Sequence, residues 1–365
     1  MPEDLTDRRC CHKCQMTSTG KKKLLKCGQC ESITYCGQKC QREDWSRHRQ
    51  FCIPVMVTEI PGKGKGLVAS KDFKKGQVLF RETAAITIHV LSSSNIVPIQ
   101  ELKDQISHLS EEQKYRFYQL TPKDYFNKSQ LAAAVRENCL QELDIFATNR
   151  LIQESIEEDE SINCMFIASS LINHSCAPNV HLDDISDSDN GLEVKAIKDI
   201  RKGEEVTFCY TKEGGLMTSS QMKTNLQEDF GFDCKCGVCA GVIPDQDRLI
   251  REISKIANVQ PNSLYQKKKK GWRIEASKFE RAADLTKQLY IGRIWDRIQV
   301  YEKFVARSQM ARDPIRLEKA MNVLKEEISA FGMMETSCLQ ATLDRWSTEF
   351  QAKRKPTKEE IDDFF

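Results

Sequence analysis

The sequence predicts an α+β protein in which a small metal-stabilised module precedes a β-rich body and a helical C-terminal part. Three observations lead to this fold class. Eight of the sixteen cysteines lie before residue 53, in a segment with few apolar residues. Short β-prone runs broken by glycine occupy residues 55–90 and 161–212, and a stretch with helical spacing lies between them. From about residue 245 the apolar residues recur as they do in helices.

Length and charge limit the kinds of function that the chain can have. Its 365 residues are enough for about two or three modest domains with a hydrophobic core. A net charge of only +2 argues against a general binder of nucleic acids or membrane surfaces. No apolar run approaches the roughly 18–20 residues of a membrane span, and the polar N-terminus has no secretory segment. We expect a monomer in the cytoplasm and/or nucleus, with no direct nucleic-acid or membrane contact.

The N-terminal cysteines are spaced as metal ligands. In a reducing compartment, clustered cysteines more often bind metal than form disulfides. A two-residue gap lets both sulfurs of a turn face one ion, and a three-residue gap does so from one helical turn. Eight ligands make two closed, structural zinc sites, each supplying about 10–16 kcal/mol of folding free energy. The candidates are Cys11, Cys14, Cys27, Cys30, Cys36, Cys40, His48 and Cys52, with Cys10 as the alternative to Cys11.

The β-rich body is interrupted by a helical segment at residues 100–157. Ser110 with Gln113 is a candidate capping box, and Thr121-Pro122 with Asp124 marks a second helix start. The longest helical stretch, Ser129–Ile156, has no internal proline or glycine. The expected strands on either side are Gly66–Ala69, Gln77–Phe80, Ala85–Ile88, Glu193–Ile197 and Glu205–Tyr210, with a turn at Gly203 and an exposed hairpin loop at Asp183–Asn190.

The C-terminal part predicts helices that suit a small array of α-hairpins. The expected helices are Asp247–Ile256, Glu280–Ala306, Pro314–Ala330 and Thr336–Lys353. The basic run Lys267–Lys270 is interpreted as a solvated loop, and a nuclear-import or nucleic-acid contact is the alternative.

Four separated segments stand out from this background. Taken one at a time, the glycines fit a surface turn, the histidine fits a loop, and the tyrosine fits a strand in the core. The spacing Cys-x-Cys-x2-Cys lacks a fourth ligand nearby, which indicates a ligand supplied from elsewhere. The segments are Gly62–Leu67, Leu171–Asn179, Gly203–Tyr210 and Phe232–Cys239.

The N-terminal pattern, which ends in His48-x3-Cys52, resembles the MYND finger at every ligand position. The resemblance implies a cross-braced arrangement of two zinc ions. It assigns one ion to Cys11, Cys14, Cys36 and Cys40, and the other to Cys27, Cys30, His48 and Cys52. It also implies a module for protein interaction that binds proline-rich peptides.

Together and in this order, the four segments resemble the SET domain of protein-lysine methyltransferases. The match spans roughly residues 55–240, and with the finger and the helical C-terminal part the whole chain resembles the SET-and-MYND (SMYD-like) proteins. The implied architecture is a MYND double-zinc finger, a β-rich SET domain with a helical insert, a zinc-binding post-SET segment and an α-helical domain. The expected ranges are residues 1–53, 54–212 (insert about 95–160), 213–245 and 246–365.

The resemblance implies roles for individual residues. Tyr210 matches the catalytic tyrosine whose hydroxyl lies beside the methyl group transferred from S-adenosylmethionine (SAM). The implied SAM-binding residues are Lys63, Gly64, Lys65, Asn149, Asn173, His174, Tyr210 and Phe232. Core packing is the alternative for Phe230 and Phe232, and an ordinary helix-end asparagine is the alternative for Asn149. Cys176 is the expected fourth ligand of a third zinc ion, with Cys234, Cys236 and Cys239.

The predicted function is a SAM-dependent protein-lysine N-methyltransferase acting on histone or non-histone proteins, with a role in chromatin regulation. The alternative is a scaffold or transcriptional corepressor that works through the finger, with a weak or inactive SET domain. Three features depart from the family pattern. The finger precedes the glycine turn, Lys65 replaces an asparagine or aromatic residue, and Phe230 replaces a second channel tyrosine, a change that we expect to alter the number of methyl groups added.

Overall fold

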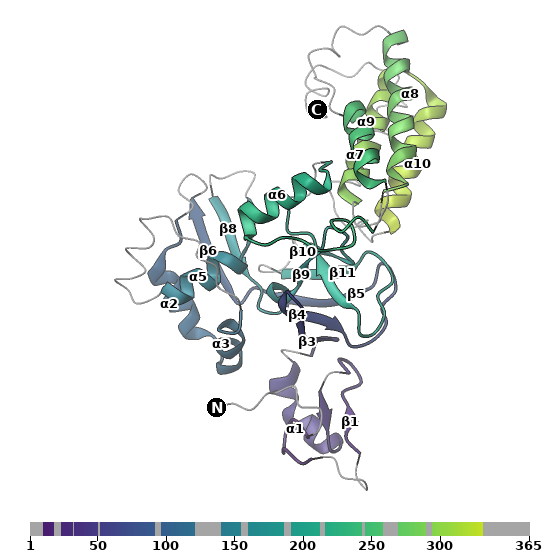
Figure 1. Ribbon diagram of the computed structural model, residues 1–365. Helices are drawn as coiled ribbons and strands as arrows, with labels where there is room; N and C mark the ends of the chain where they lie inside the picture. The colour runs from purple at the N-terminus through teal and green to yellow at the C-terminus, as the bar shows by residue number, and fades with distance from the viewer. Residues whose placement is uncertain are drawn as a thin grey trace. The chain divides into compact units, whose positions relative to one another are not determined.

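The computed structural model describes residues 10–17, 23–31, 33–49, 52–91, 96–120, 140–154, 160–185, 191–211, 216–242, 245–257, 269–289 and 294–330 (Figure 1). Its backbone packing divides the chain into two compact units. The first comprises Met1–Asn173 and Val180–Thr207, and the second comprises His174–Asn179 and Phe208–Phe365. In the described part of the chain, no helix has the length and apolar character needed to cross a bilayer.

The first unit begins with a small finger whose interior is built from cysteines. Its elements are β1 (Leu25–Lys26), β2 (Thr34–Tyr35) and α1 (Gln38–His48), and the two strands pair antiparallel. The buried cluster consists of Cys11, Cys27, Cys30, Tyr35 and Cys52. A module with so few aliphatic side chains and such short strands needs a further source of stability.

Strands form much of the remaining first unit, and β9 and β12 each end at a residue of the second unit. The sheets have the strand orders β10-β11-β5, β6-β8-β7 and β3-β4-β12-β9. The predicted strands of the body are confirmed as β4, β5, β6, β11 and β12. The strands are β3 (Val55–Ile60), β4 (Gly64–Ala69), β5 (Val78–Thr83), β6 (Ile86–Leu91), β7 (Leu151–Glu154), β8 (Glu160–Met165), β9 (Asn173–His174), β10 (Val180–Ile185), β11 (Gly191–Ala196) and β12 (Glu205–Phe208).

The helical insert is shorter than the sequence suggests. It contains α2 (Ile99–His108), α3 (Glu111–Phe117) and α5 (Leu140–Asn149). The predicted capping box is confirmed, because Ser110 Oγ accepts from the Gln113 backbone and Gln113 Oε1 accepts from the Ser110 backbone. The predicted helix to Ile156 is wrong after Asn149, because Leu151–Glu154 pairs with β8 and satisfies its backbone groups there. The helix start predicted at Thr121-Pro122 lies outside the described residues.

The hairpin of β10 and β11 begins its turn later than predicted. Ile185 is opposite Gly191, so residues Asp183 to Ile185 are strand rather than loop. The charge of Asp183 is compatible with a strand because His181 lies 3.0 Å and Lys195 lies 3.4 Å from its carboxylate. The remainder of the predicted loop, residues 186–190, lies outside the described residues.

The second unit contains α6 (Ser219–Phe230), a helix that we did not predict. Thr218 and Gln221 form a capping box at its start. Gly231 ends the helix with φ 70°, a left-handed conformation that favours glycine. The sharp turn leaves Phe230 and Phe232 on either side of one glycine.

Within the described residues, four further helices follow, and α8, α9 and α10 lie side by side (Figure 1). They are α7 (Gln246–Ala257), α8 (Lys269–Thr286), α9 (Ile294–Met310) and α10 (Pro314–Ala330). The predicted continuous helix Glu280–Ala306 is wrong, since α8 and α9 are separate and the interval contains Gly292, a poor helix former. The predicted loop at Lys267–Lys270 is also wrong at Lys269 and Lys270, which open α8. The predicted helix Thr336–Lys353 lies outside the described residues.

Candidate functional site

The first group of metal-ligand candidates brings the start of the finger together with the start of α1. The sulfurs of Cys11, Cys14, Cys36 and Cys40 all lie within 4.8 Å of one another. The distance from Cys36 Sγ is 3.6 Å to Cys14 Sγ and 3.3 Å to Cys40 Sγ. Cys10 is not in the group, since its Sγ lies 3.2 Å from Gln15 Oε1. The structure therefore favours Cys11 over the alternative Cys10.

The second group uses the other four finger ligands, all of them buried. Cys27, Cys30, His48 and Cys52 place their ligand atoms within 4.8 Å of one another. Cys27 Sγ lies 3.7 Å from Cys52 Sγ, and Cys30 Sγ lies 3.4 Å from His48 Nε2. The two groups interleave along the chain, which is the cross-braced pairing that the resemblance implied.

The donor sets and their spacing fit zinc. Bonds of roughly 2.3 Å from a tetrahedral zinc ion to sulfur place the sulfurs about 3.8 Å apart. Three sulfur–sulfur distances in the two groups are 3.3–3.7 Å, and all ligand atoms of each group lie within 4.8 Å of one another, so an ion at each centre needs little rearrangement. Four thiolates, or three with an imidazole, are the soft donors that select zinc. With all four positions taken, such sites are structural.

A buried polar network supports the imidazole ligand. If His48 Nε2 faces the metal, Nδ1 carries the proton and donates to Tyr35 Oη at 2.8 Å. Tyr35 Oη in turn donates to Asp44 Oδ2 at 2.8 Å, and His12 Nδ1 lies 2.6 Å from the same oxygen. Burial opposes the charge of Asp44, but the hydrogen bonds from His12 and Tyr35 lower its pKa overall. Such outer partners orient metal ligands and raise metal affinity.

The sequence did not reveal Tyr35 and Asp44 as functional residues. The available signal was position, because Asp44 precedes His48 by four residues and therefore lies on the same face of α1. Tyr35 immediately precedes the ligand Cys36. His12, which the sequence left without a role, is the outer member of this network.

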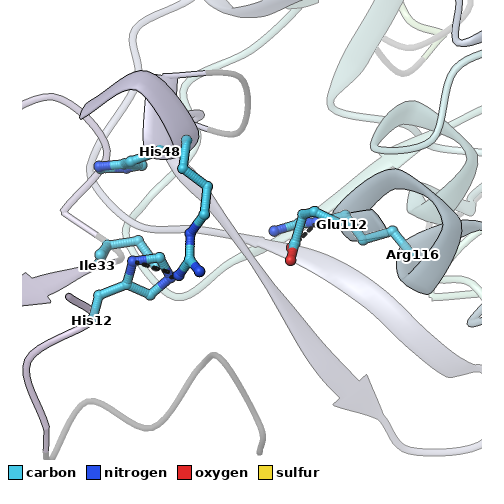
Figure 2. Close-up of a pocket in the computed structure, with 6 residues that line it drawn as sticks. His12, Ile33, His48, Glu112 and Arg116 are labelled. Atoms are coloured by element: carbon cyan, nitrogen blue, oxygen red, sulfur yellow. Dashed lines mark hydrogen bonds and ion pairs between the residues drawn. The ribbon is translucent and has the colours of Figure 1, made fainter. Parts of the chain in front are cut away.

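A small pocket of about 30 Å³ lies between the finger and α3 (Figure 2). On the finger side of the pocket, Arg47 Nη2 lies 3.2 Å from His12 Nε2. From α3, Glu112 accepts a hydrogen bond from Arg116 Nε at 2.8 Å. A second pocket of about 370 Å³ shares Arg116, and neither pocket is lined by the predicted SAM-binding residues.

The third metal group lies in the second unit. Cys176, Cys234, Cys236 and Cys239 place their sulfurs within 4.8 Å of one another. Cys176 Sγ lies 3.8 Å from Cys234 Sγ and 3.4 Å from Cys239 Sγ, again close to the edge of a zinc tetrahedron. The ligand expected from a distant segment is thus Cys176, at a separation of 58 residues from Cys234.

Aromatic rings gather beside this third group. The ring centroid of Tyr210 lies 5.1 Å from that of Phe230 and 6.3 Å from that of Phe232. His174 is buried, and its ring centroid lies 5.3 Å from that of Tyr210. The rings of Tyr210, Phe230 and Phe232 are only partly buried, so they form a surface and not a sealed core. Three predicted site residues of the second unit, His174, Tyr210 and Phe232, are therefore neighbours.

The predicted site residues of the first unit other than Asn149 meet at the glycine turn between β3 and β4. Gly62 and Gly64 have φ of 75° and 71°, which is the left-handed region that glycine adopts at little cost. Gly66 serves a different purpose, because a Cβ there would lie 2.5 Å from Asn173 Nδ2. Asn173 Nδ2 donates to the Lys65 carbonyl at 3.1 Å. The turn and Asn173 therefore form one interlocked group.

Glu205 joins this group, although sequence reasoning gave it no role. Its carboxylate accepts from Asn173 Nδ2 at 3.1 Å and from Lys63 Nζ at 2.7 Å. Lys65 Nζ donates a hydrogen bond to Gln119 Oε1 instead. The signal that could have identified Glu205 is its place in the Gly203-Glu204-Glu205 motif.

Glu82 anchors the segment that leads into Asn173. Its carboxylate accepts from the Ala168 backbone at 2.8 Å and from the Ser169 backbone at 2.9 Å, at the start of the 3₁₀ turn η2 (Ser169–Leu171). Burial raises the pKa of Glu82, although these hydrogen bonds act in the opposite direction. No sequence motif pointed to Glu82.

Asn149 is engaged within its own helix. Its side-chain amide donates to the Ile145 carbonyl at 2.8 Å, and its backbone carbonyl accepts from Ser170 Oγ at 3.1 Å. This is the behaviour of a residue that ends a helix. A contact between Asn149 and SAM stays a prediction.

Comparison with known families assigns both modules. Residues 64–211 match the SET domain, and residues 11–52 match the MYND finger. Mouse histone-lysine N-methyltransferase SMYD3 is 28% identical over 252 residues, which are 65% of this chain and 53% of that protein. Human N-lysine methyltransferase SMYD2 is 26% identical over 265 residues, which are 67% of this chain and 54% of that protein. The chain spans about half the length of the curated relatives it matches.

Among solved structures, the histone lysine methyltransferase DIM-5 of Neurospora matches 46% of this chain and 55% of its own, with 21% identity and a TM-score of 0.22. A TM-score of this size supports no inference about function.

We predict that Tyr35→Phe weakens zinc binding by the finger about 10- to 100-fold, the range for loss of an outer partner of a metal ligand. The change removes a hydroxyl that connects His48 to Asp44 and leaves both polar groups buried without it. Zinc release to a chromophoric chelator measures the effect. Tyr115→Phe, at an exposed position on α3, is the matched control. Equal release rates for Tyr35→Phe and the wild type would contradict the role of the network.

We predict that Gly66→Ala lowers the free energy of unfolding by about 1–3 kcal/mol, the usual cost of overpacking. The new methyl group would meet Asn173 Nδ2 at 2.5 Å and Ile60 Cγ1 at 2.7 Å. Gly37→Ala is the control, because nothing lies within 4 Å of a Cβ built there. Urea unfolding of the zinc-loaded proteins compares them, and a Gly66→Ala protein as stable as the control would refute the close approach.

Proposed function

We propose that this chain, which carries a MYND finger and a SET domain and is a distant relative of SMYD2 and SMYD3, is a SAM-dependent protein-lysine N-methyltransferase. The observation that carries the proposal is the interlocked glycine turn with Asn173, joined by one peptide bond to His174 of the aromatic cluster. The SET domain itself indicates the methyltransferase family.

The glycine turn supports cofactor binding through groups that are already oriented. Among the described residues, the side-chain hydrogen bonds of Asn173 both use Nδ2, so Oδ1 accepts no hydrogen bond there. An amide oxygen fixed in this way can accept from the ammonium group of SAM. Lys63 and Glu205 form an ion pair that holds the turn against β12. We propose that Lys63, Gly64, Lys65, Asn149, Asn173, His174, Tyr210 and Phe232 bind SAM.

The aromatic cluster supports a channel for the substrate lysine. Rings of Tyr210, Phe230 and Phe232 present apolar, partly exposed surfaces around one hydroxyl. An apolar channel disfavours the charged form of an entering lysine and so favours the neutral amine that can act as a nucleophile. It also excludes water from the reacting atoms.

Bound SAM would supply an electrophilic methyl group, and the residues of the chain would orient the partners. We propose that the Tyr210 hydroxyl lies beside the transferring methyl and stabilises its partial positive charge with a fixed oxygen. Holding the amine in line with the carbon–sulfur bond provides much of the rate enhancement. The third Cys group holds the segment that follows Phe232 and would keep this wall of the site closed.

The finger would recruit protein partners. Leu25 and Trp45 are exposed on it, at 57% and 39%, and suit contact with a proline-rich peptide. We propose protein lysines as substrates, on histone or non-histone proteins, and a monomer of the cytoplasm and/or nucleus. A role in chromatin regulation follows if the substrate is a histone.

The test is calorimetric binding of SAM to the zinc-loaded chain. We expect the wild type to bind SAM and Asn173→Ala to bind at least 10-fold more weakly, because it loses the oriented amide. Asn322→Ala, at an exposed position of α10, is the matched control and should bind as the wild type does. We expect Tyr210→Phe to keep SAM affinity and to lower methyl transfer from tritiated SAM to histone octamers about 10²–10³-fold.

Failure of the wild type to bind SAM would overturn the enzyme proposal. The chain would then act as a MYND-based scaffold or corepressor. Equal SAM affinity for Asn173→Ala and Asn322→Ala would leave the enzyme proposal in place but remove Asn173 from the cofactor site.

A further inference from the structure

The side chain of His174 connects a metal ligand to the backbone of Tyr210. Its Nδ1 atom accepts a hydrogen bond from the Tyr210 backbone N–H at 3.0 Å. Its Nε2 atom lies 3.2 Å from Cys176 Sγ. Both ring nitrogens are therefore engaged, each with a partner of different chemistry.

These contacts determine where the proton of the imidazole is. Nδ1 faces an N–H donor and must be the unprotonated nitrogen. In the neutral ring the single proton is then on Nε2, which points at Cys176 Sγ. A sulfur that is bound to zinc as a thiolate is an acceptor only, so an Nε2–H···S hydrogen bond completes the arrangement.

The surroundings of the ring leave it one orientation. His174 is only 4% exposed. The ring of Tyr210 packs against it at 5.3 Å with an interplanar angle of 68°, and the ring of Phe232 packs at 5.8 Å with 54°. Turning the imidazole over would point carbon atoms at the Tyr210 N–H and at the Cys176 sulfur, and would leave both buried groups without their hydrogen bonds.

We propose that His174 is a positioning residue: its neutral Nε2–H tautomer holds the Tyr210 backbone in register with the metal centre of Cys176, Cys234, Cys236 and Cys239. The chain of contacts runs from Cys176 Sγ through the imidazole to the Tyr210 amide. The adjacent hydrogen bond from the Ser175 backbone to the Phe208 carbonyl, at 2.9 Å, holds the same two segments together one residue away. The importance of Tyr210 rests on the proposed function, whereas the link itself does not.

The tautomer can be observed directly in the wild-type protein. In the zinc-loaded full chain with ¹⁵N-labelled histidine, two-bond proton–nitrogen correlation spectra distinguish Nε2–H from Nδ1–H rings. We expect the His174 ring, assigned by its absence in His174→Gln, to be neutral with the proton on Nε2. A proton on Nδ1, or on both nitrogens, would overturn the proposal without requiring any variant to fold.

Two variants separate the two hydrogen bonds. The amide oxygen of His174→Asn occupies the place of Nδ1 and keeps the acceptor for Tyr210, but it loses the donor to Cys176. His174→Gln extends an N–H to the place of Nε2 and keeps the donor to Cys176, but it loses the acceptor for Tyr210. In the cadmium-substituted full chain, ¹¹³Cd spectra report each metal group separately, and Cys236→Ser identifies the resonance of the Cys176 group.

We expect the Cys176-group resonance to shift in His174→Asn and to stay near its wild-type position in His174→Gln, with the two finger resonances unchanged in both. We expect methyl transfer to fall at least 10-fold in His174→Gln although its cadmium resonance is retained. A Cys176-group resonance that is unchanged in His174→Asn would show that no hydrogen bond reaches the sulfur. If the wild type binds no SAM, the proposed function fails, while the tautomer and cadmium results still decide the link.

Discussion

The geometry of the closed cysteine groups is the constraint on which the rest of the molecule depends. The finger has almost no aliphatic interior, and its buried cluster consists of four cysteines and one tyrosine. Short strands cannot hold such a module, whereas a structural zinc ion contributes about 10–16 kcal/mol to folding. The second unit has a similar group, in which Cys176 lies beside the sulfurs of Cys234, Cys236 and Cys239, although Cys176 and Cys234 are 58 residues apart in the sequence. Zinc would therefore supply the long-range order that apolar packing supplies elsewhere.

In two of the metal groups, a histidine connects the group to other residues because its two ring nitrogens contact different partners. In the finger, His48 Nε2 faces the metal group and Nδ1 contacts Tyr35, which leads to the buried Asp44. In the second unit, His174 contacts the sulfur of Cys176 and, on its other side, the Tyr210 backbone. The first arrangement ends in a carboxylate and stabilises a ligand. The second ends at a tyrosine that we place in the reaction, so the metal group there would bear on activity.

Much of the metal chemistry could be predicted from the sequence, because a ligand set depends on residue type and spacing. Pairs such as Cys11 and Cys14 lie in single turns, and even the distant ligand Cys176 was indicated by the incomplete Cys-x-Cys-x2-Cys pattern. The supporting residues could not be predicted in the same way. Glu82 and Glu205 act through contacts between segments far apart in the chain, and nothing in their local sequence marks those partners. The prediction of secondary structure was wrong where strand pairing determines the conformation. The predicted helix included Leu151–Glu154, but these residues pair with β8 and form β7.

We propose that the three metal groups have different roles: the Cys176 group serves the proposed active site, and the finger serves stability and recruitment. The most direct measurement counts bound zinc by native mass spectrometry and measures SAM affinity in two matched variants, Cys236→Ser and Cys30→Ser. We predict that each variant loses one zinc ion, that Cys236→Ser binds SAM at least 10-fold more weakly than the wild type, and that Cys30→Ser keeps wild-type SAM affinity. Equal SAM affinity in the two variants, with one zinc ion lost from each, would contradict this proposal.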